Sequence, residues 1–308
     1  MSPRQQALVD LLGRLKSQGY RFVTPGNPTI RTIRGRADKA WAADLRDVFG
    51  WSLPFRKGLL DEGLVELMQA ADILEAADGG QRSALRVSSI GEALFLHSAF
   101  PTTARDAVFF GPDTYRYVRF LRERLPSWTA KLVVDIGAGG GPGGICLGRM
   151  WPQARILLTD VNCAALELAQ VNARFNGVAA ECLEGEGLDP VREGPDLVIA
   201  NPPFIAASEG QTYQEGGDAY GSAVSVAWAE EAMRRLTPRG CMLLYTGSAI
   251  VDGGDPFRER LDALAREHDC SLEYEEIDPD IFGDELTRDA YAGVERLAAV
   301  GAVIRRAG

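Results

Sequence analysis

The stretch LVVDIGAGGGPGG, residues 132–144, decides the fold, because it joins a strand pattern to a glycine-rich turn and a helix start. Apart from Asp135, its first five residues are apolar, which is typical of a strand covered on both faces. The glycines that follow let the backbone pass close to a ligand, since no Cβ intervenes. Pro142 suits the first turn of a helix. Strand, glycine turn and helix together predict a ligand site at the edge of an α/β sheet.

Downstream of this stretch, short apolar runs alternate with helical segments. We predict strands near residues 132–136, 155–160, 179–183, 197–200, 242–245, 271–277 and 299–304. Helices are expected between them, at 143–150, 164–176, 222–236 and 256–268. This rhythm indicates βαβ units and a parallel sheet. We therefore predict an α/β fold with a Rossmann-like, seven-stranded, doubly wound sheet over residues 127–308.

Upstream, residues 1–126 read as a separate, mostly helical N-terminal domain that selects the substrate. Apolar residues recur at helical spacing after Ser2-Pro3, and Gly19 ends that segment. Further helices are expected at 39–48, 62–76 and 114–125, with a turn at Asp78-Gly79-Gly80 and a short strand at 85–88.

Composition limits the function classes. The chain has 308 residues, 46% of them hydrophobic, and a formal net charge of -10. No apolar run approaches the roughly 20 residues of a membrane span. The first ten residues lack the apolar region of a signal peptide, so we expect a cytoplasmic protein without membrane contact. The five cysteines are widely spaced and only two histidines occur, which argues against a metal site and against histidine-centred catalysis.

The charge is unevenly distributed. Residues 1–60 contain eleven basic and four acidic residues, a net charge of +7, so the remainder carries -17. The overall acidity argues against broad nucleic-acid binding. The basic front end is either a solvated helical surface or a surface that faces an acidic partner.

The glycine loop also matches a dinucleotide-binding pattern, Gly139-x-Gly141-x-x-Gly144, which is a weak signal when it stands alone. Asp135 argues against that interpretation. A carboxylate at the end of the strand would repel a pyrophosphate but attract a sulfonium or ammonium group. The loop therefore favours a cationic nucleoside ligand.

Two further acidic residues follow neighbouring strands. Asp160 ends the second strand, 19 residues after Gly141, where an acid would accept hydrogen bonds from ribose hydroxyls. Its alternative role is to cap the next helix. Glu186 follows the third strand and would meet an adenine amino group, or it is simply an exposed loop acid.

The segment Asn201-Pro202-Pro203-Phe204 is the most specific signal in the chain. It follows the fourth strand, so it lies at the same edge of the sheet as the glycine loop. The prolines fix the backbone and carry no N–H groups. The Asn201 side-chain oxygen and the Pro202 carbonyl can then accept from one amino group, while Phe204 offers a stacking face.

This arrangement suits methyl transfer to a conjugated nitrogen. Two acceptors in fixed positions can turn the nitrogen lone pair toward a methyl donor. S-adenosylmethionine is already an activated electrophile, so positioning supplies most of the rate and no nucleophilic side chain is required.

These motifs resemble the HemK/PrmC group of N5-glutamine methyltransferases, within the class I S-adenosylmethionine-dependent methyltransferases. The resemblance rests on residues 135–141, Asp160 and Asn201-Pro202-Pro203-Phe204, and covers about residues 131–250. Gly216-Gly217-Asp218 is also similar to a Gly-Gly-x-Asp stretch of that group. The glutamine enzymes usually carry Tyr where this chain has Phe204. The longer N-terminal unit has no counterpart that we can match.

The resemblance implies S-adenosylmethionine as the cofactor and a site formed by a defined set of residues. The predicted catalytic residues are Asn201, Pro202 and Phe204. The predicted cofactor-binding residues are Asp135, Gly137, Ala138, Gly139, Gly141, Asp160, Val161, Glu186 and Asn201. The aromatic residues of the segment 109–115 either wall this site or pack in a core. Tyr213, Glu215 and Tyr220 follow the motif, where a loop could close over the substrate.

The identity of the methyl acceptor stays open. By resemblance, a glutamine side chain in a protein of the release-factor type is the first expectation. Close relatives also methylate ribosomal proteins or amino groups in nucleic acids, so an rRNA, tRNA or DNA amine is the alternative. A small-molecule methyltransferase and a non-catalytic S-adenosylmethionine-binding protein are further alternatives.

Overall fold

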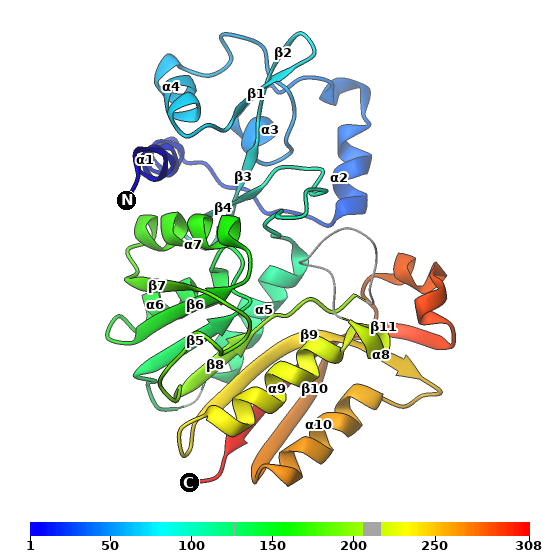
Figure 1. The fold of residues 1–308 in the computed structure, drawn as a ribbon. Coiled ribbons are helices and arrows are strands. Elements are labelled where there is room, and N and C mark those ends of the chain that lie inside the picture. The colour runs from blue at the N-terminus through cyan, green and yellow to red at the C-terminus, as the bar shows by residue number, and fades with distance from the viewer. Residues whose placement is uncertain (126, 206–216) are drawn as a thin grey trace.

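The computed structural model describes residues 1–125, 127–205 and 217–308 of the chain. Its N-terminal part stands on one end of a large twisted sheet, and helices cover both faces of that sheet (Figure 1).

The central sheet contains the seven predicted strands. They are β5 (Leu132–Ile136), β6 (Arg155–Asp160), β7 (Ala180–Glu184), β8 (Leu197–Ala200), β9 (Cys241–Val251), β10 (Cys270–Asp278) and β11 (Val294–Arg306). Their order across the sheet is β10-β11-β9-β8-β5-β6-β7. The expected seven-stranded doubly wound fold is confirmed. The glycine stretch leaves the central strand β5, beside β8, at the point where the order of strands reverses.

The sheet differs from the expected parallel arrangement at one strand. β11 runs antiparallel to both of its neighbours, β9 and β10, while the remaining pairs are parallel. β9 and β11 also extend beyond their predicted bounds, because they pair with each other along nearly their whole length from Val251 to Cys241. The sequence pattern showed the apolar centre of each strand and not its direction.

Helices bury apolar faces on both sides of the sheet. α5 (Pro112–Arg124), α6 (Pro142–Met150) and α7 (Cys163–Phe175) share one core cluster with the strands. α9 (Ala223–Arg235) and α10 (Pro256–Glu267) share another cluster on the opposite face. The short elements α8 (Asp218–Gly221), η2 (Gly283–Thr287) and η3 (Asp289–Tyr291) lie in connections. Because β5 alternates its side chains, Val133 faces the first cluster and Val134 faces the second.

The N-terminal part combines helices with two hairpins. Its helices are α1 (Pro3–Ser17), α2 (Asn27–Arg34), η1 (Ala37–Lys39), α3 (Leu45–Phe49) and α4 (Glu62–Ala70). The hairpins are β1 (Leu74–Ala77) with β2 (Gly80–Ser83), and β3 (Leu85–Ile90) with β4 (Ala93–Ser98). The sequence had indicated only the strand at 85–88, so the part contains more strand than expected.

Two predicted helices were wrong in extent. The helix expected at 62–76 ends at Ala70, because Asp72 takes a left-handed φ of 54° and the chain then enters β1. The helix expected at 39–48 is only the short α3, which Asp44 caps through the backbone N–H of Asp47.

Helix α7 joins the two parts of the molecule. Its residues Ala169 and Ala173 pack toward the sheet, whereas Ala165, Leu168 and Val171 belong to the core cluster of the N-terminal part. The domain boundary between residues 126 and 127 stays a prediction, and the two parts share this helix as a common wall.

Asn172 of α7 is fully buried and links three segments. Its Oδ1 accepts from the Leu96 N–H at 2.8 Å, and its Nδ2 donates to the carbonyls of Leu96 at 3.1 Å and Gly140 at 2.9 Å. One side chain therefore holds β4 of the N-terminal part and the glycine loop in fixed positions relative to each other.

Within the described ranges, no helix combines the length and apolar character needed to cross a bilayer.

We expect Asn172→Ala to lower the free energy of unfolding by about 2–4 kcal/mol, because it leaves buried backbone groups of Leu96 and Gly140 without partners. Urea titration followed by circular dichroism measures this change. Gln170→Ala, at an exposed position of the same helix, is the control and should change the value by less than about 0.5 kcal/mol. A loss below about 1 kcal/mol for Asn172→Ala would contradict the linking role.

Candidate active site

The glycine loop between β5 and α6 relies on left-handed backbone conformations. Gly137, Gly139 and Gly141 have φ values of 62°, 55° and 79°. Gly141 is the N-cap of α6. Pro142 is the first residue of the helix, one residue before the predicted start and in the first turn, as expected. A Cβ at Gly141 would lie 2.9 Å from Ile145 Cδ1, so the tight turn requires glycine there.

Asp135 is buried beneath this loop with an exposed fraction of 1%. Its Oδ2 accepts from the Gly144 N–H at 2.8 Å, and its Oδ1 accepts from the Tyr117 hydroxyl of α5 at 3.1 Å. Burial raises the pKa of Asp135 to about 7, and these two hydrogen bonds oppose that rise. The carboxyl group therefore gains or loses its charge near neutral pH.

Gly143 makes the contact between Tyr117 and Asp135 possible. A Cβ at Gly143 would lie 2.7 Å from Tyr117 Cε1 and 2.9 Å from Asp135 Oδ2. The glycine run therefore serves two purposes, because it forms the turn and also opens space for a phenol beneath it.

Asp160 closes the loop from the neighbouring strand. Its Oδ2 accepts from the Gly139 N–H and its Oδ1 from the Asn162 N–H, both at 2.8 Å. Burial raises its pKa, while these backbone donors lower it. The cap of α7 is Asn162, whose Oδ1 accepts from Ala164 at 3.0 Å, so the alternative role of Asp160 as that cap is not observed.

A cavity of about 370 Å³ opens at this edge of the sheet. The structure brings eight of the predicted residues into its wall, namely Asp135, Gly137, Ala138, Gly139, Asp160, Val161, Glu186 and Asn201. Gly141, Pro202 and Phe204 are not among the lining residues. The cavity thus collects side chains that follow four parallel strands.

The asparagine of the motif holds an unpaired acceptor. Asn201 Oδ1 is buried and has no hydrogen-bond partner among the residues that the structure describes. Pro203, and not Pro202, stands in the cavity wall. An unpaired buried oxygen is costly unless a ligand supplies a donor.

Phe204 packs against another aromatic residue and against β9. Its ring lies 5.7 Å from the ring of Phe282, centroid to centroid. It also covers Gly247 of β9, where a Cβ would lie 2.5 Å from Phe204 Cδ2. The missing side chain at Gly247 leaves room for the ring on β9.

Several lining residues could not be identified from the sequence. Thr114 and Tyr117 come from α5, and Val224 and Trp228 come from α9. Tyr117 lies with Val118 and Leu121 in the core cluster, so in the sequence it resembles an ordinary core residue of the helix. The aromatic residues of the segment 109–115 were expected either to wall the site or to pack in a core, and both arrangements occur. Phe109 lines the cavity, whereas Phe110 is buried against His97.

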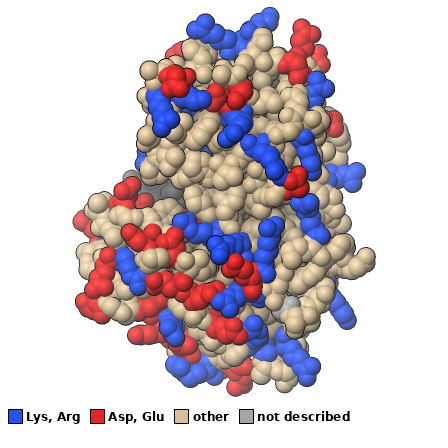
Figure 2. Space-filling view, turned by 180° about the vertical axis from the view of Figure 1, so that it is seen from behind, with Lys and Arg blue, Asp and Glu red and all other residues tan. Residues whose placement is uncertain are grey.

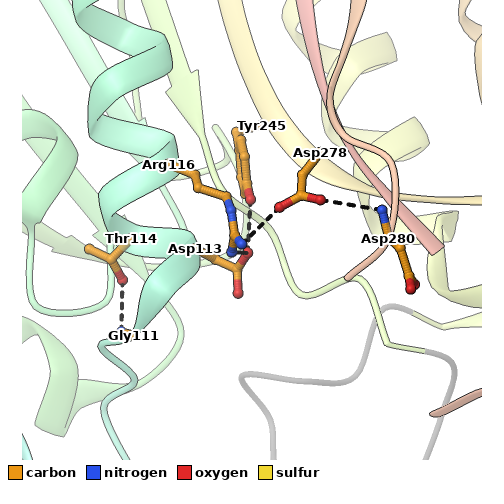
Figure 3. A network of polar contacts seen from close by, with 7 residues as sticks. All are labelled: Gly111, Asp113, Thr114, Arg116, Tyr245, Asp278 and Asp280. Atoms are coloured by element: carbon orange, nitrogen blue, oxygen red, sulfur yellow. Dashed lines mark hydrogen bonds and ion pairs between the residues drawn. The ribbon is translucent and has the colours of Figure 1, made fainter. Parts of the chain in front are cut away.

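A polar network fixes α5 at the sheet edge (Figure 3). The Tyr245 hydroxyl of β9 donates to the buried Asp113 at 2.8 Å. Arg116 lies 3.3 Å from Asp113 and 2.9 Å from Asp278, at the end of β10. Burial raises the pKa of Asp113, while Tyr245 and Arg116 oppose that rise. The network ties the start of α5 to β9 and β10, and so holds Thr114 and Tyr117 in place.

Three residues singled out in the sequence, Tyr213, Glu215 and Gly216, lie outside the described residues. Tyr220 is described and has a left-handed φ of 57°.

The chain is similar in sequence and fold to known methyltransferases. Residues 104–246 match the family model described as the methyltransferase small domain. A release factor glutamine methyltransferase of Bordetella pertussis is 32% identical over 111 residues, which cover 35% of this chain and 41% of that protein. A ribosomal RNA small subunit methyltransferase C of Hahella chejuensis is 38% identical over 84 residues, 27% of this chain and 25% of that protein. The chain therefore matches less than half the length of each of these relatives.

A solved structure shows the same fold. Trm5 of Methanocaldococcus jannaschii, in complex with adenosine, superposes with a TM-score of 0.51 at 15% identity and covers 83% of this chain and 63% of that chain. Residues 104–246 are therefore similar to the methyltransferase small domain family, and the chain has a class I methyltransferase fold.

Proposed function

We propose that this protein transfers the methyl group of S-adenosylmethionine to a planar amide or amine nitrogen. The observation that carries the proposal is the buried, unpaired Oδ1 of Asn201 in the wall of the cavity. A carbonyl oxygen in that position accepts from a nitrogen that still bears hydrogen. It would not position a methyl acceptor that carries no hydrogen-bond donor, such as a carbon or a thiolate.

The residues around the cavity fit the cofactor. The cavity has a volume of about 370 Å³, which lies within the usual range for small-molecule sites. Asp135 would face the positive charge of the sulfonium or ammonium group. Each Asp160 oxygen accepts one backbone N–H and has further acceptor capacity for ribose hydroxyls. Glu186 is exposed on the wall and would meet the adenine amino group.

The protein's own contribution to the reaction is position and electrostatics. The bound cofactor supplies an electrophilic methyl group, so the chain needs no nucleophile. Asn201 would accept from the N–H of the target and turn its lone pair toward the methyl group, while the carboxylate of Asp135 would hold the donor in place. The roles of Pro202 and Phe204 stay predictions, since both residues stand outside the cavity wall.

A glutamine side chain in a protein is the first candidate for the acceptor. Support comes from the motif and from the Bordetella relative that is named for release factor glutamine methylation. Transfer of label from S-adenosylmethionine into a whole-cell lysate, separated into protein, nucleic-acid and small-molecule fractions, tests this directly. Nuclease-resistant label in protein would support glutamine. Absence of label from every fraction would contradict the proposed function.

A nucleic-acid amine is the second candidate, and surface charge favours it. The basic segment, residues 31–57, carries seven basic and three acidic residues. Five of its cations are exposed and form no ion pair with any described residue, namely Arg31, Arg36, Arg46, Arg56 and Lys57. On the face in Figure 2, acidic side chains gather in the lower part of the molecule, and the upper part carries more basic than acidic groups.

The helix that carries the first cations of the basic segment, α2, begins beside α5. Gly26, the N-cap of α2, lies against Pro112 at the start of α5, where a Cβ would be 3.9 Å from Pro112 Cγ. The Tyr115 hydroxyl of α5 accepts from the Thr24 N–H at 3.0 Å. The chain just before the basic segment therefore contacts the helix that lines the site.

We expect Asn201→Ala to lower methyl transfer by at least about 100-fold, because a positioned hydrogen-bonding group at the reacting atom is removed. The measurement is incorporation of labelled methyl groups into the lysate. Binding of the cofactor, measured by calorimetry, should stay within about threefold. Asn201→Asp keeps an acceptor oxygen and should lose less activity than Asn201→Ala. Unchanged turnover in Asn201→Ala would show that the motif is not catalytic.

Affinity for S-adenosylmethionine should rise with pH through about 7. Because burial raises the pKa of Asp135 to about 7, the carboxyl is protonated below that pH and loses its attraction for a cation. We expect the dissociation constant to increase by up to about tenfold for each pH unit below 7. Calorimetry from pH 5.5 to about 8.5 measures this, and Asp135→Asn should remove the dependence. The neutral ligand 5′-methylthioadenosine is the control. An equally steep pH dependence for that ligand would rule out the charge interaction.

If the acceptor is a nucleic acid, the double variant Arg31→Gln/Arg36→Gln should weaken binding of a single-stranded oligonucleotide. It should also reduce the slope of log affinity against log salt concentration by about 0.7 for each lost phosphate contact. Fluorescence anisotropy at several salt concentrations measures both effects. Arg260→Gln/Arg266→Gln, which removes two exposed cations from α10, is the matched control. Equal effects of the two double variants would mean that no defined phosphate site lies on the basic segment.

A further inference from the structure

Trp228 of α9 lines the cavity, although neither the glycine loop nor the asparagine motif predicts a residue from this helix there. Its side chain is almost completely buried, with an exposed fraction of 9%. It belongs to the core cluster on the α9 face of the sheet and also lines the cavity. A large aromatic residue from the opposite face therefore forms part of the floor of the site.

The glycine loop is shaped around this indole. A Cβ at Gly137 would lie 2.5 Å and 2.9 Å from two carbons of the six-membered ring of Trp228. Gly187, which follows β7, lies beside the other edge, where a Cβ would be 3.4 Å from Trp228 Nε1. Both glycines line the cavity. The indole thus spans from the end of β5 to the segment after β7.

The nitrogen of this indole lacks a partner. Trp228 Nε1 is buried and makes no hydrogen bond within the part of the chain that the structure describes. An indole N–H can only donate, and leaving it unpaired in a buried site is costly. The same wall carries the carboxyl groups of Asp135, Asp160 and Glu186, which only accept hydrogen bonds when they are ionised. Trp228 therefore adds a donor to a wall that is rich in acceptors.

A purine ring has the matching chemistry, since its ring nitrogens accept hydrogen bonds and its face is apolar. Glu186 directly precedes Gly187 and is the residue proposed to meet the adenine amino group. The nitrogen edge of Trp228 is next to the same segment. We propose that Trp228 is a positioning residue for the cofactor, whose indole N–H donates to a ring nitrogen of the adenine. This inference rests on the proposed function, because it requires an adenine nucleoside in the cavity.

The first test observes the indole N–H itself. With ¹⁵N-labelled tryptophan, the chain gives one indole resonance for each of its five tryptophans, and the resonance missing from Trp228→Phe identifies position 228. Addition of S-adenosylhomocysteine should shift that resonance downfield, as expected when the N–H gains an acceptor. An unmoved resonance at saturating ligand would overturn the proposal.

The second test measures binding. Trp228→Phe keeps a flat ring and removes the donor, and we expect it to weaken binding of S-adenosylhomocysteine by about 3–10-fold. Trp151→Phe, at a partly buried tryptophan outside the cavity, is the control and should bind as the wild type does. Thermal unfolding without ligand checks that both variants fold.

Ligand analogues then identify the acceptor atom. The 1-deaza, 3-deaza and 7-deaza forms of S-adenosylhomocysteine each replace one ring nitrogen by carbon. One analogue should bind the wild type about 3–10-fold more weakly than S-adenosylhomocysteine does. In Trp228→Phe the same replacement should cause no further loss of affinity, as a double-mutant cycle requires when both changes remove one interaction. Independent losses for all three analogues would overturn the proposal. If the wild type fails to bind S-adenosylhomocysteine at all, the proposed function fails; if it binds and only the Trp228 effects are absent, this inference alone fails.

Discussion

The buried carboxyl group of Asp135 is the constraint around which the site is built. Burying a charge is costly unless hydrogen bonds compensate it. Here the compensation comes from the Gly144 N–H at the start of α6 and from the Tyr117 hydroxyl of α5. The two contacts fix both helices relative to β5, and they leave no room for a side chain at Gly143. The carboxyl group of Asp135 therefore determines the positions of α5 and α6, the shape of the glycine loop and the depth of the cavity.

Much of the catalytic fold was readable from the sequence, because buried strands and the helices between them have strong periodic signals. All seven strands of the sheet lie where apolar runs predicted them. The direction of β11 was not readable, since an apolar run has the same appearance in either direction. The N-terminal hairpins were partly missed for a related reason. Leu74–Ala77 continues the helical apolar pattern of α4, and only the left-handed turn at Asp72 and pairing with β2 make it a strand.

The residues of the candidate site also fall into two groups, those that the sequence indicated and those that it did not. Glycines, Asp160 and Asn201 were recognised because they follow strands at fixed spacing, and the carboxyl ends of parallel strands meet at one edge. Tyr117 and Trp228 were not recognised, since on a helix they read as ordinary core residues until a tertiary contact gives their polar atoms a role. Phe204 shows what a motif leaves undetermined. A motif gives the residue type, but Gly247 on a neighbouring strand decides where the ring can lie.

Helix α7 has a consequence for how such a protein can evolve. One side of it completes the core of the sheet and the other completes the core of the N-terminal part, while Asn172 bonds to both β4 and the glycine loop. The N-terminal part is therefore not an interchangeable attachment. A recombination event that brought in a different N-terminal part would also have to bring a matching surface for α7, so this part is more easily altered by point changes than by replacement.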